Sequence, residues 1–205
     1  WCEDQDFFRF SGIYRDVYLY AIPEVHVSDV KIQTLLDDTF TKADLVIDTK
    51  ATKAGKVKIT LSKAGKELQS VEETLAEESQ YVMKVENPEL WSAESPVLYD
   101  LLLEVMDENG QVTEVIPQRV GFRRIMMLNG KRIVFKGVNR HEFSSVSGRV
   151  VSREELIKDL VTMKQNNINA IRTCHYPDAV GIYELCDEYG IYMIAECNME
   201  SHGSW

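Results

Sequence analysis

Three of the four histidines lie where a short apolar run gives way to a polar, loop-like segment. They are His141 in residues 139–142 (NRHE), His175 in residues 174–177 (CHYP) and His202 in residues 200–203 (ESHG). Imidazole nitrogens bind metal ions and form hydrogen bonds, so the three side chains could share a metal site or a hydrogen-bonded framework. We predict one site that is assembled from three strand ends.

Glu200 and His202 are two residues apart. In an extended segment both side chains project to the same side, and a carboxylate and an imidazole presented together can take part in metal binding. Two ligands are too few to hold a divalent ion unaided, so the spacing alone leaves a structural role open. His141 and His175, taken singly, are equally consistent with hydrogen-bonded structural groups.

Charged residues near these histidines have more than one interpretation. Arg140 and Glu142 flank His141 and could form an ion-pair framework with no catalytic role, which would contribute little at the surface. Glu196 lies one residue beyond an apolar run and could be an acid, a ligand or a hydrogen-bond anchor. Residues 3–6 (EDQD) hold three carboxylates, and a solvated acidic turn is the default interpretation of such a run.

Each histidine segment comes after an apolar run that has the character of a buried strand. The runs are residues 133–135, 170–172 and 192–195. Segments with a helical pattern separate them, so the last 80 or so residues are predicted to fold as β-α-β-α-β. Chemistry in such folds gathers at the carboxyl ends of parallel strands, which is where the histidines are placed. Three strands do not close a barrel.

Two helices are predicted between these strands. Residues 152–155 (SREE) form a capping box, and apolar residues follow at helical spacing to about Asn166. The second helix is predicted from near Asp178 to Gly190, where glycine provides the expected left-handed cap. The residues expected to face inward are Leu156, Leu160 and Met163 in the first helix and Ile182, Leu185 and Cys186 in the second.

The preceding part of the chain, to about residue 123, has an all-β pattern. Strands are predicted at residues 25–36, 43–49, 56–61, 81–85, 98–106 and 112–120. Val57, Ile59 and Leu61 alternate with polar residues and are expected to face the core. This many short strands in about 100 residues indicates an immunoglobulin-like sandwich. The fourth histidine, His26, is expected to be a surface-facing strand residue.

Residues 1–21 are alternating and rich in aromatic side chains. The runs that carry this character are residues 7–10 (FFRF) and 17–20 (VYLY). We interpret the segment as the last strands of a domain that begins earlier in the protein.

Composition excludes several classes of protein. The chain is 44% hydrophobic and 27% charged, as in ordinary folded proteins. A net charge of −10 without clusters of Lys or Arg argues against nucleic acid as a partner. The four cysteines lack paired spacing, so reduced thiols are expected. No apolar run is long enough to span a membrane. We expect a cytoplasmic protein, with the periplasm as the alternative because the chain opens on Trp1 rather than Met.

Six short motifs, taken together, resemble those of family 2 glycoside hydrolases. In chain order they are residues 11–17 (SGIYRDV), 87–92 (NPELWS), 120–123 (VGFR), 137–142 (GVNRHE), 163–167 (MKQNN) and 200–203 (ESHG). The resemblance spans nearly the whole chain and is greatest to the lac-type bacterial β-galactosidases. The related β-glucuronidases typically lack a match to the Glu-x-His-Gly ending.

The resemblance implies a mixed fold and a piece cut from the middle of a larger enzyme. Residues 1–21 would be the C-terminal end of a jelly-roll sugar-binding domain, and residues 22–123 an all-β immunoglobulin-like sandwich. Residues 124–205 would be the first three β/α units of a catalytic (β/α)8 TIM barrel.

The resemblance also implies roles for individual residues, with a β-galactoside as the substrate. His141 and His175 would contact the sugar and stabilise the transition state, and His202 would also contact the substrate. Glu200 and His202 would bind Mg²⁺ or Mn²⁺, and Asp6 would contact the galactosyl hydroxyls and Na⁺. This chain departs from the lac-type pattern at residues 143–145, where further histidines are usual, and at Asp178, where asparagine is common, so the shape of the sugar pocket is left open.

The same resemblance places both catalytic glutamates on later barrel strands, so the chain by itself is expected to be inactive. Two alternatives remain: another family 2 glycosidase, such as a β-glucuronidase or a β-mannosidase, or a non-catalytic sandwich module. The parent protein is expected to be a homo-oligomer. The open edge of a partial barrel predicts self-association of this chain through residues 130–200.

Overall fold

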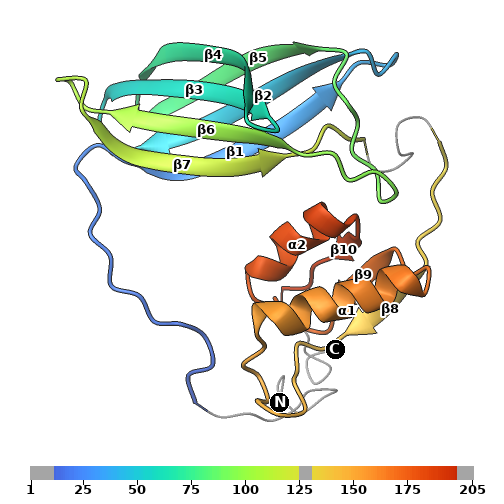
Figure 1. The fold of residues 1–205 in the computed structure, drawn as a ribbon. Coiled ribbons are helices and arrows are strands. Elements are labelled where there is room, and N and C mark those ends of the chain that lie inside the picture. The colour runs from blue at the N-terminus through green and yellow to red at the C-terminus, as the bar shows by residue number, and fades with distance from the viewer. Residues whose placement is uncertain (1–11, 125–130, 198–205) are drawn as a thin grey trace, which may run out of the picture. The chain divides into compact units, whose positions relative to one another are not determined.

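The computed structural model describes residues 12–124 and 131–197 of the 205-residue chain. These residues belong to two compact units (Figure 1). One unit comprises Trp1–Tyr18 with Val134–Trp205, and the other comprises Leu19–Ile133. Asp6, Glu200 and His202 fall outside the described residues.

The Leu19–Ile133 unit is built from antiparallel strands in two sheets (Figure 1). The strands are β1 (Val27–Leu36), β2 (Lys42–Ala51), β3 (Gly55–Lys63), β4 (Lys66–Leu75), β5 (Glu78–Glu86), β6 (Tyr99–Met106) and β7 (Val112–Val120). One sheet has the order β1-β2-β5 and the other has the order β4-β3-β6-β7. Apolar side chains from both sheets share one core, so the unit is a β-sandwich.

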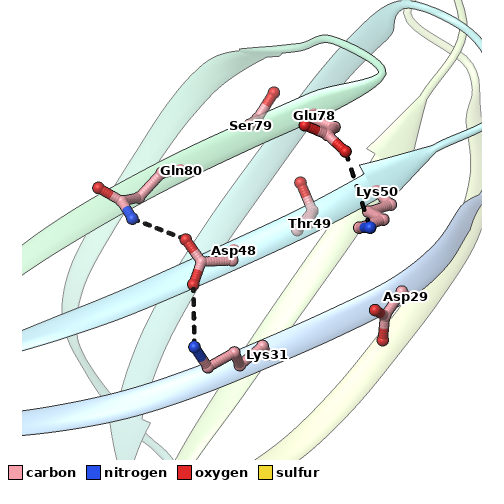
Figure 2. A pocket seen from close by; sticks show the side chains of 8 residues that line it. All are labelled: Asp29, Lys31, Asp48, Thr49, Lys50, Glu78, Ser79 and Gln80. Carbon is pink, nitrogen blue, oxygen red and sulfur yellow. Dashed lines mark hydrogen bonds and ion pairs between the residues drawn. The ribbon is translucent and has the colours of Figure 1, made fainter.

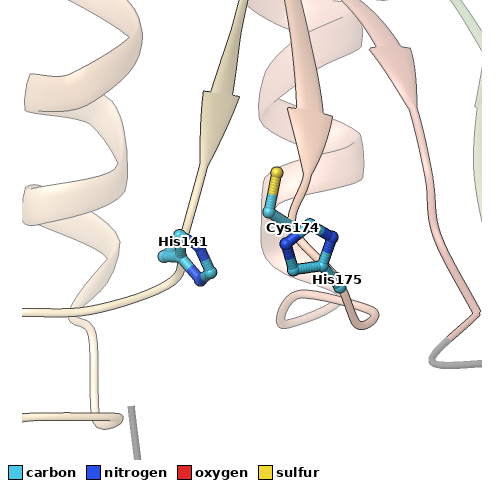
Figure 3. A group of neighbouring side chains, drawn as sticks. All are labelled: His141, Cys174 and His175. Atoms are coloured by element: carbon cyan, nitrogen blue, oxygen red, sulfur yellow. The ribbon is translucent and has the colours of Figure 1, made fainter. Parts of the chain in front are cut away.

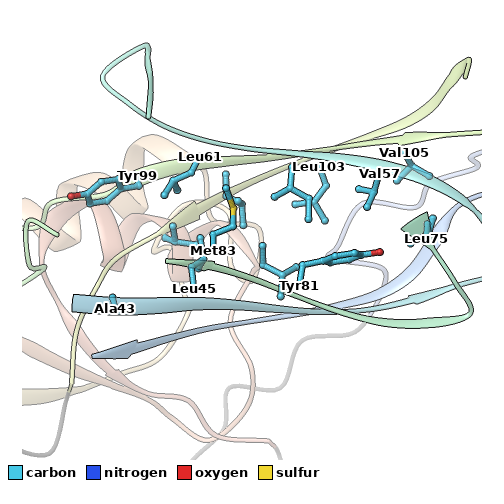
Figure 4. Packing of buried hydrophobic residues seen from close by; sticks show 14 of the residues in the cluster. Ala43, Leu45, Val57, Leu61, Leu75, Tyr81, Met83, Tyr99, Leu103 and Val105 are labelled. Atoms are coloured by element: carbon cyan, nitrogen blue, oxygen red, sulfur yellow. The ribbon is translucent and has the colours of Figure 1, made fainter. Parts of the chain in front are cut away.

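The core of the sandwich follows from period-2 alternation along each strand. On β3 the buried residues are Val57, Ile59 and Leu61, as the sequence predicts. Leu101 and Leu103 of β6 are also buried, and Figure 4 shows side chains of this core lying between the sheets. Polar side chains at the alternate positions are left toward the solvent. In the described part of the chain, the core between the two sheets therefore contains none of the predicted site histidines.

Strand β4 is a strand that the sequence pattern did not predict. Its residues (KELQSVEETL) are mostly charged or polar, and only Leu75 is buried. It lies at the edge of its sheet and pairs with β3 alone. An edge strand needs no continuous apolar face, and charged side chains there protect the edge from pairing with other chains.

The segment at residues 17–20 does not form the strand that its aromatic alternation indicates. Residues 12–24 contain no strand, and Val17, Leu19 and Tyr20 are exposed. Alternation gives a segment the side-chain pattern of a strand, but strand structure also requires a hydrogen-bonded neighbour. None of the described strands pairs with this segment.

The other unit contains the expected β-α-β-α-β order. Its elements are β8 (Gly137–Arg140), α1 (Arg153–Gln165), β9 (Ala170–Thr173), α2 (Gly181–Tyr189) and β10 (Tyr192–Ile194). The three strands are parallel, in the sheet order β10-β9-β8. Residues from α1, α2 and the strands form a second apolar core that includes Leu160, Ile171 and Leu185.

The two helices confirm most of the helical prediction. The hydroxyl of Ser152 accepts from the backbone N–H of Glu155, whose carboxylate accepts from the N–H of Ser152 in return. Helix α2 begins three residues later than expected, at Gly181, and ends at Gly190 with a φ of 68°. The side chain of Lys164 in α1 donates to the carbonyl of Gly190, which links the ends of the two helices.

The first strand of this sheet lies four residues further along the chain than predicted. Residues 133–135 are not a strand, and Val134 and Phe135 are largely exposed. The strand is instead β8, in register with β9 from Gly137 opposite Ala170. A Cβ at Gly137 would lie 3.3 Å from Ala170, so the close approach at this point suits glycine. The shift puts His141 directly after the last residue of the strand.

Candidate functional site

His141 and His175 come together at the carboxyl ends of neighbouring strands. His141 follows β8, and His175 lies two residues after β9. Their ring centroids are 5.6 Å apart with an interplanar angle of 77°, and Figure 3 shows both rings just beyond the ends of the strands. The ring of Tyr176 lies 6.1 Å from that of His141. The structure thus brings these two predicted site residues together, while His202 lies outside the described residues.

Cys174 is a member of this cluster that the sequence analysis did not single out. Ligand atoms of His141, Cys174 and His175 all lie within 4.8 Å of one another. Cys174 is buried, and this burial raises the pKa of its thiol above the usual value. Its position directly before His175 is the sequence signal that could have revealed it.

Arg172 and Glu196 support the ring of His175. The guanidinium of Arg172 donates to a carboxylate oxygen of Glu196, and Nη2 of Arg172 lies 3.2 Å from Nδ1 of His175. The second carboxylate oxygen of Glu196 lies 3.5 Å from the same Nδ1. The backbone N–H of Glu196 donates to the hydroxyl of Thr173 at 2.9 Å. Glu196 could be an acid, a ligand or a hydrogen-bond anchor by sequence, and these contacts are those of a hydrogen-bond anchor.

Arg140, the residue before His141 in the sequence, carries a buried charge. Its side chain is 5% exposed, and it donates to a carboxylate oxygen of Asp178 at 2.6 Å and to Asp159 at 3.0 Å. Desolvation raises the pKa of Asp178 to about 6, although the charge of Arg140 acts in the opposite direction. Oδ1 of Asp178 has no hydrogen-bond partner among the described residues. The ion pair between Arg140 and Asp178 joins the last residue of β8 to the segment after β9.

Glu142, two residues after β8, makes a second link to the segment after β9. Its fully buried carboxylate accepts from the guanidinium of Arg15 and from the backbone N–H of Ala179, the latter at 2.8 Å. Arg140 and Glu142 thus each belong to an ion pair, as the sequence interpretation allows, but in the interior rather than at the surface. Both side chains are buried, and each pairs with a different partner: Arg140 with Asp178, and Glu142 with Arg15. Nothing local in the sequence points to Arg15, which is 127 residues away from Glu142.

Arg149 holds two aromatic rings beside the cluster. Its guanidinium carbon lies 3.9 Å from the ring centroid of Tyr176 and 4.5 Å from that of Tyr14. Such cation–π contacts stabilise the ring beside His175 and fix the segment that carries Arg15. The segments around the cluster are therefore held by the ion pair of Arg15 with Glu142 and by the cation–π contact of Arg149 with Tyr176.

The sandwich has a separate depression of about 490 Å³ that does not have the features of a site. Figure 2 shows its polar lining on β1, β2 and β5, including a hydrogen bond from Gln80 to Asp48 and ion pairs of Lys31 with Asp48 and of Lys50 with Glu78. Ligand sites are mostly apolar with a few convergent polar groups, whereas this surface is a row of solvated cross-strand ion pairs.

Two models of one protein family match this chain in succession. Residues 25–123 match "Glycosyl hydrolases family 2", and residues 118–205 match "Glycosyl hydrolases family 2, TIM barrel domain". The chain belongs to glycoside hydrolase family 2. The expected family is thereby confirmed, and its architecture of a sandwich followed by the start of a TIM barrel matches the two units.

Curated family 2 relatives are similar along the whole chain. A β-galactosidase of Halalkalibacterium halodurans is 50% identical, and one of Streptococcus thermophilus is 49% identical. Both matches cover 100% of this chain and 21% of the relative. The chain thus spans about a fifth of the length of these relatives.

Solved family 2 structures share the fold. The β-glucuronidase 3 of Bacteroides uniformis superposes with a TM-score of 0.87 at 30% sequence identity. That match covers 96% of this chain and 26% of the solved chain.

The three cysteines in the described residues, Cys174, Cys186 and Cys197, are free, as expected from their spacing. No helix in the described part of the chain is both long and apolar enough to cross a membrane.

Proposed function

We propose that the protein to which this chain belongs is a retaining β-galactosidase that removes terminal, non-reducing β-D-galactose from β-galactosides. The observation that carries the proposal is the identity of up to 50% to β-galactosidases over the whole chain, including the segments that bring His141 and His175 together. The activity is proposed for the whole protein. The two catalytic glutamates are assigned to later barrel strands, so the 205-residue chain alone is expected to be inactive.

His141 and His175 are proposed to contact the galactosyl unit. An N–H of each ring can donate to a sugar oxygen, and such hydrogen bonds to the sugar hydroxyls strengthen in the oxocarbenium-like transition state. Donors that are already oriented need no reorganisation during the reaction. Arg172 and Glu196 hold the ring of His175 in place before the sugar arrives, and the ion pair of Arg140 with Asp178 fixes the end of β8 next to His141.

Glu200 and His202 are proposed to bind Mg²⁺ or Mn²⁺, and Asp6 is proposed to contact the sugar and Na⁺. A carboxylate oxygen suits Mg²⁺, whereas the nitrogens and sulfur of the cluster at His141 do not. When bound, Mg²⁺ would supply positive charge that tunes the acid/base carboxyl group. His202 is proposed to reach the substrate as well.

The finer architecture is also a proposal. Residues 22–123 form an immunoglobulin-like domain, supported by two antiparallel sheets of three and four strands around one core. Residues 124–205 supply the first three β/α units of the (β/α)8 barrel, and residues 1–21 end a jelly-roll domain. We propose a homo-oligomeric, cytoplasmic parent. The 205-residue chain is expected to self-associate through its open sheet edge, which light scattering would show as a mass above that of the monomer.

A family 2 β-glucuronidase is the second candidate. The observation that favours it is the TM-score of 0.87 to a β-glucuronidase structure. The sequence identity to that protein is 30%, against 50% to a β-galactosidase, so we place β-galactosidase first.

A substrate panel separates these candidates. The whole protein would be incubated with chromogenic β-galactoside, β-glucuronide and β-mannoside, with Mg²⁺ and with a chelator. We expect rapid turnover of the galactoside alone, with a fall on chelation. Turnover of the glucuronide instead would support the second candidate, and no turnover of any glycoside would favour a non-catalytic module.

A further inference from the structure

The ends of β8 and β9 bring two imidazoles and a thiol into one cluster (Figure 3). The ligand atoms of His141, Cys174 and His175 lie within 4.8 Å of one another. Around Zn²⁺, bonds of about 2.3 Å to sulfur and about 2.0 Å to nitrogen place tetrahedral donors roughly 3.5 Å apart. Side-chain rotations that shorten the longest separation by about 1.3 Å would therefore bring all three donors onto one ion.

We propose that His141, Cys174 and His175 form a binding site for a Zn²⁺-type transition-metal ion. Imidazole and thiolate are the ligands such ions prefer, whereas Mg²⁺ takes oxygen ligands. The site is therefore different in chemistry from the one assigned to Glu200 and His202. Three protein ligands leave a fourth position for water, as in open zinc sites.

The surroundings of His175 suit a ligand role. A metal-binding histidine usually donates its other ring N–H to a carboxylate, which fixes the tautomer. Nδ1 of His175 lies 3.5 Å from a carboxylate oxygen of Glu196, so Nε2 is assigned to the metal. Binding selects the tautomer with the proton on Nδ1, directed at Glu196 rather than accepting from Arg172. The thiol proton of Cys174 passes to solvent as the thiolate forms.

The consequence for catalysis rests on the proposed function. If His141 and His175 contact the galactosyl unit, an ion held by the same rings excludes the sugar. Zn²⁺ would then inhibit the whole enzyme in competition with the galactoside. Inhibition of this origin requires the sulfur of Cys174, which distinguishes it from replacement of Mg²⁺ elsewhere.

Binding is tested by titrating the 205-residue chain with Co²⁺ and recording its absorption, with circular dichroism to verify folding. Tetrahedral Co²⁺ bound to a thiolate gives an intense near-ultraviolet band. We expect saturation of this band by one ion per chain. Cys174→Ser should abolish it, and Glu196→Gln should weaken binding by on the order of 10-fold. Cys197→Ser is the matched control, because that thiol is exposed and outside the cluster, and it should keep the band.

A folded chain without the band, or a band that survives in Cys174→Ser and disappears in Cys197→Ser, would overturn the proposal. None of these measurements needs glycosidase activity, so they are independent of the proposed function. In the whole enzyme, the inhibition constant for Zn²⁺ should rise at least about 10-fold in Cys174→Ser relative to Cys197→Ser. Equal inhibition of the two variants would show that the ion does not act through this cluster.

Discussion

Asp178 is a buried carboxyl group whose ionisation is opposed by its surroundings. The charged groups that act on it are Arg140, Glu142 and Arg15, and desolvation outweighs the attraction of the two guanidiniums. Its pKa is raised from 3.8 to about 6, so the folded state binds its proton more tightly than the unfolded state does. The stability that this group contributes is present below about pH 4 and is lost as the pH rises through about 6.

Asp178→Asn should remove this pH dependence, because the amide has no proton to lose in that range. The difference between the two pKa values corresponds to on the order of 3 kcal/mol, so the fall in unfolding free energy between pH 4 and pH 7 should shrink by about that amount. Denaturant unfolding at several pH values measures it. Asp159→Asn is the matched control, since it removes the half-exposed partner of the same Arg140 and leaves Asp178 in place. An unchanged slope in Asp178→Asn would contradict the account.

At the scale of elements, the sequence predicts the helices and strands that are marked by a short pattern within their own residues, such as a cap or a period-2 alternation. The capping box at Ser152, the glycine cap at Gly190 and the alternation at residues 57–61 are each confirmed. Strand β4 has no such signal, because an edge strand takes its structure from β3 rather than from an apolar face. The apolar run 133–135 predicts the first strand of the parallel sheet too early in the chain, whereas pairing with β9 selects residues 137–140.

Ser152→Ala tests the most local of these signals. The substitution leaves a backbone N–H of the first turn of α1 without its side-chain acceptor, which should lower the unfolding free energy by about 1 kcal/mol. Thermal or denaturant unfolding measures the change. Thr162→Ala is the control, because that hydroxyl bonds a carbonyl within the same helix and its loss should be neutral or slightly stabilising. Equal losses in both variants would argue against a specific role for the cap.

The sequence likewise predicts only part of the site, namely the part that depends on the order of neighbouring elements. The order of the elements predicts that His141 and His175 meet, because the carboxyl ends of adjacent parallel strands share one edge. It does not predict Arg15 beside Glu142, or the depth at which Arg140 and Asp178 are buried. Those contacts depend on how distant segments pack, which no short stretch of sequence specifies.

At the scale of the whole molecule, residues before the sandwich in the sequence complete the unit that follows it. Arg15 binds Glu142, and Tyr14 stacks on Arg149. The unit that contains the sandwich, Leu19–Ile133, is thus inserted between two parts of the other unit. The site at His141 therefore depends on a segment that precedes the sandwich.

Arg15→Met should loosen that unit alone. It leaves the buried carboxylate of Glu142 without its cation, at a cost of about 3 kcal/mol, the low end for a broken buried pair, because Arg15 is partly exposed. Hydrogen exchange should show lost protection in β8, β9 and β10 and unchanged protection in β2 and β6. Lys53→Met, which removes an exposed ion pair with Glu24, should change neither unit measurably. Equal loss of protection in both units would contradict this dependence.

The most direct test of the central claim is kcat/KM for a β-galactoside in the whole protein carrying His141→Ala, His175→Ala or both. Loss of a hydrogen bond that strengthens in the transition state should lower kcat/KM by about 10²–10³ for each single variant. The double variant should lose less than the product of the two, because the rings share one substrate. His26→Asn, which changes a histidine of the sandwich, should be unaffected. Single variants that retain full kcat/KM would show that the imidazoles at the ends of β8 and β9 do not contact the reacting sugar.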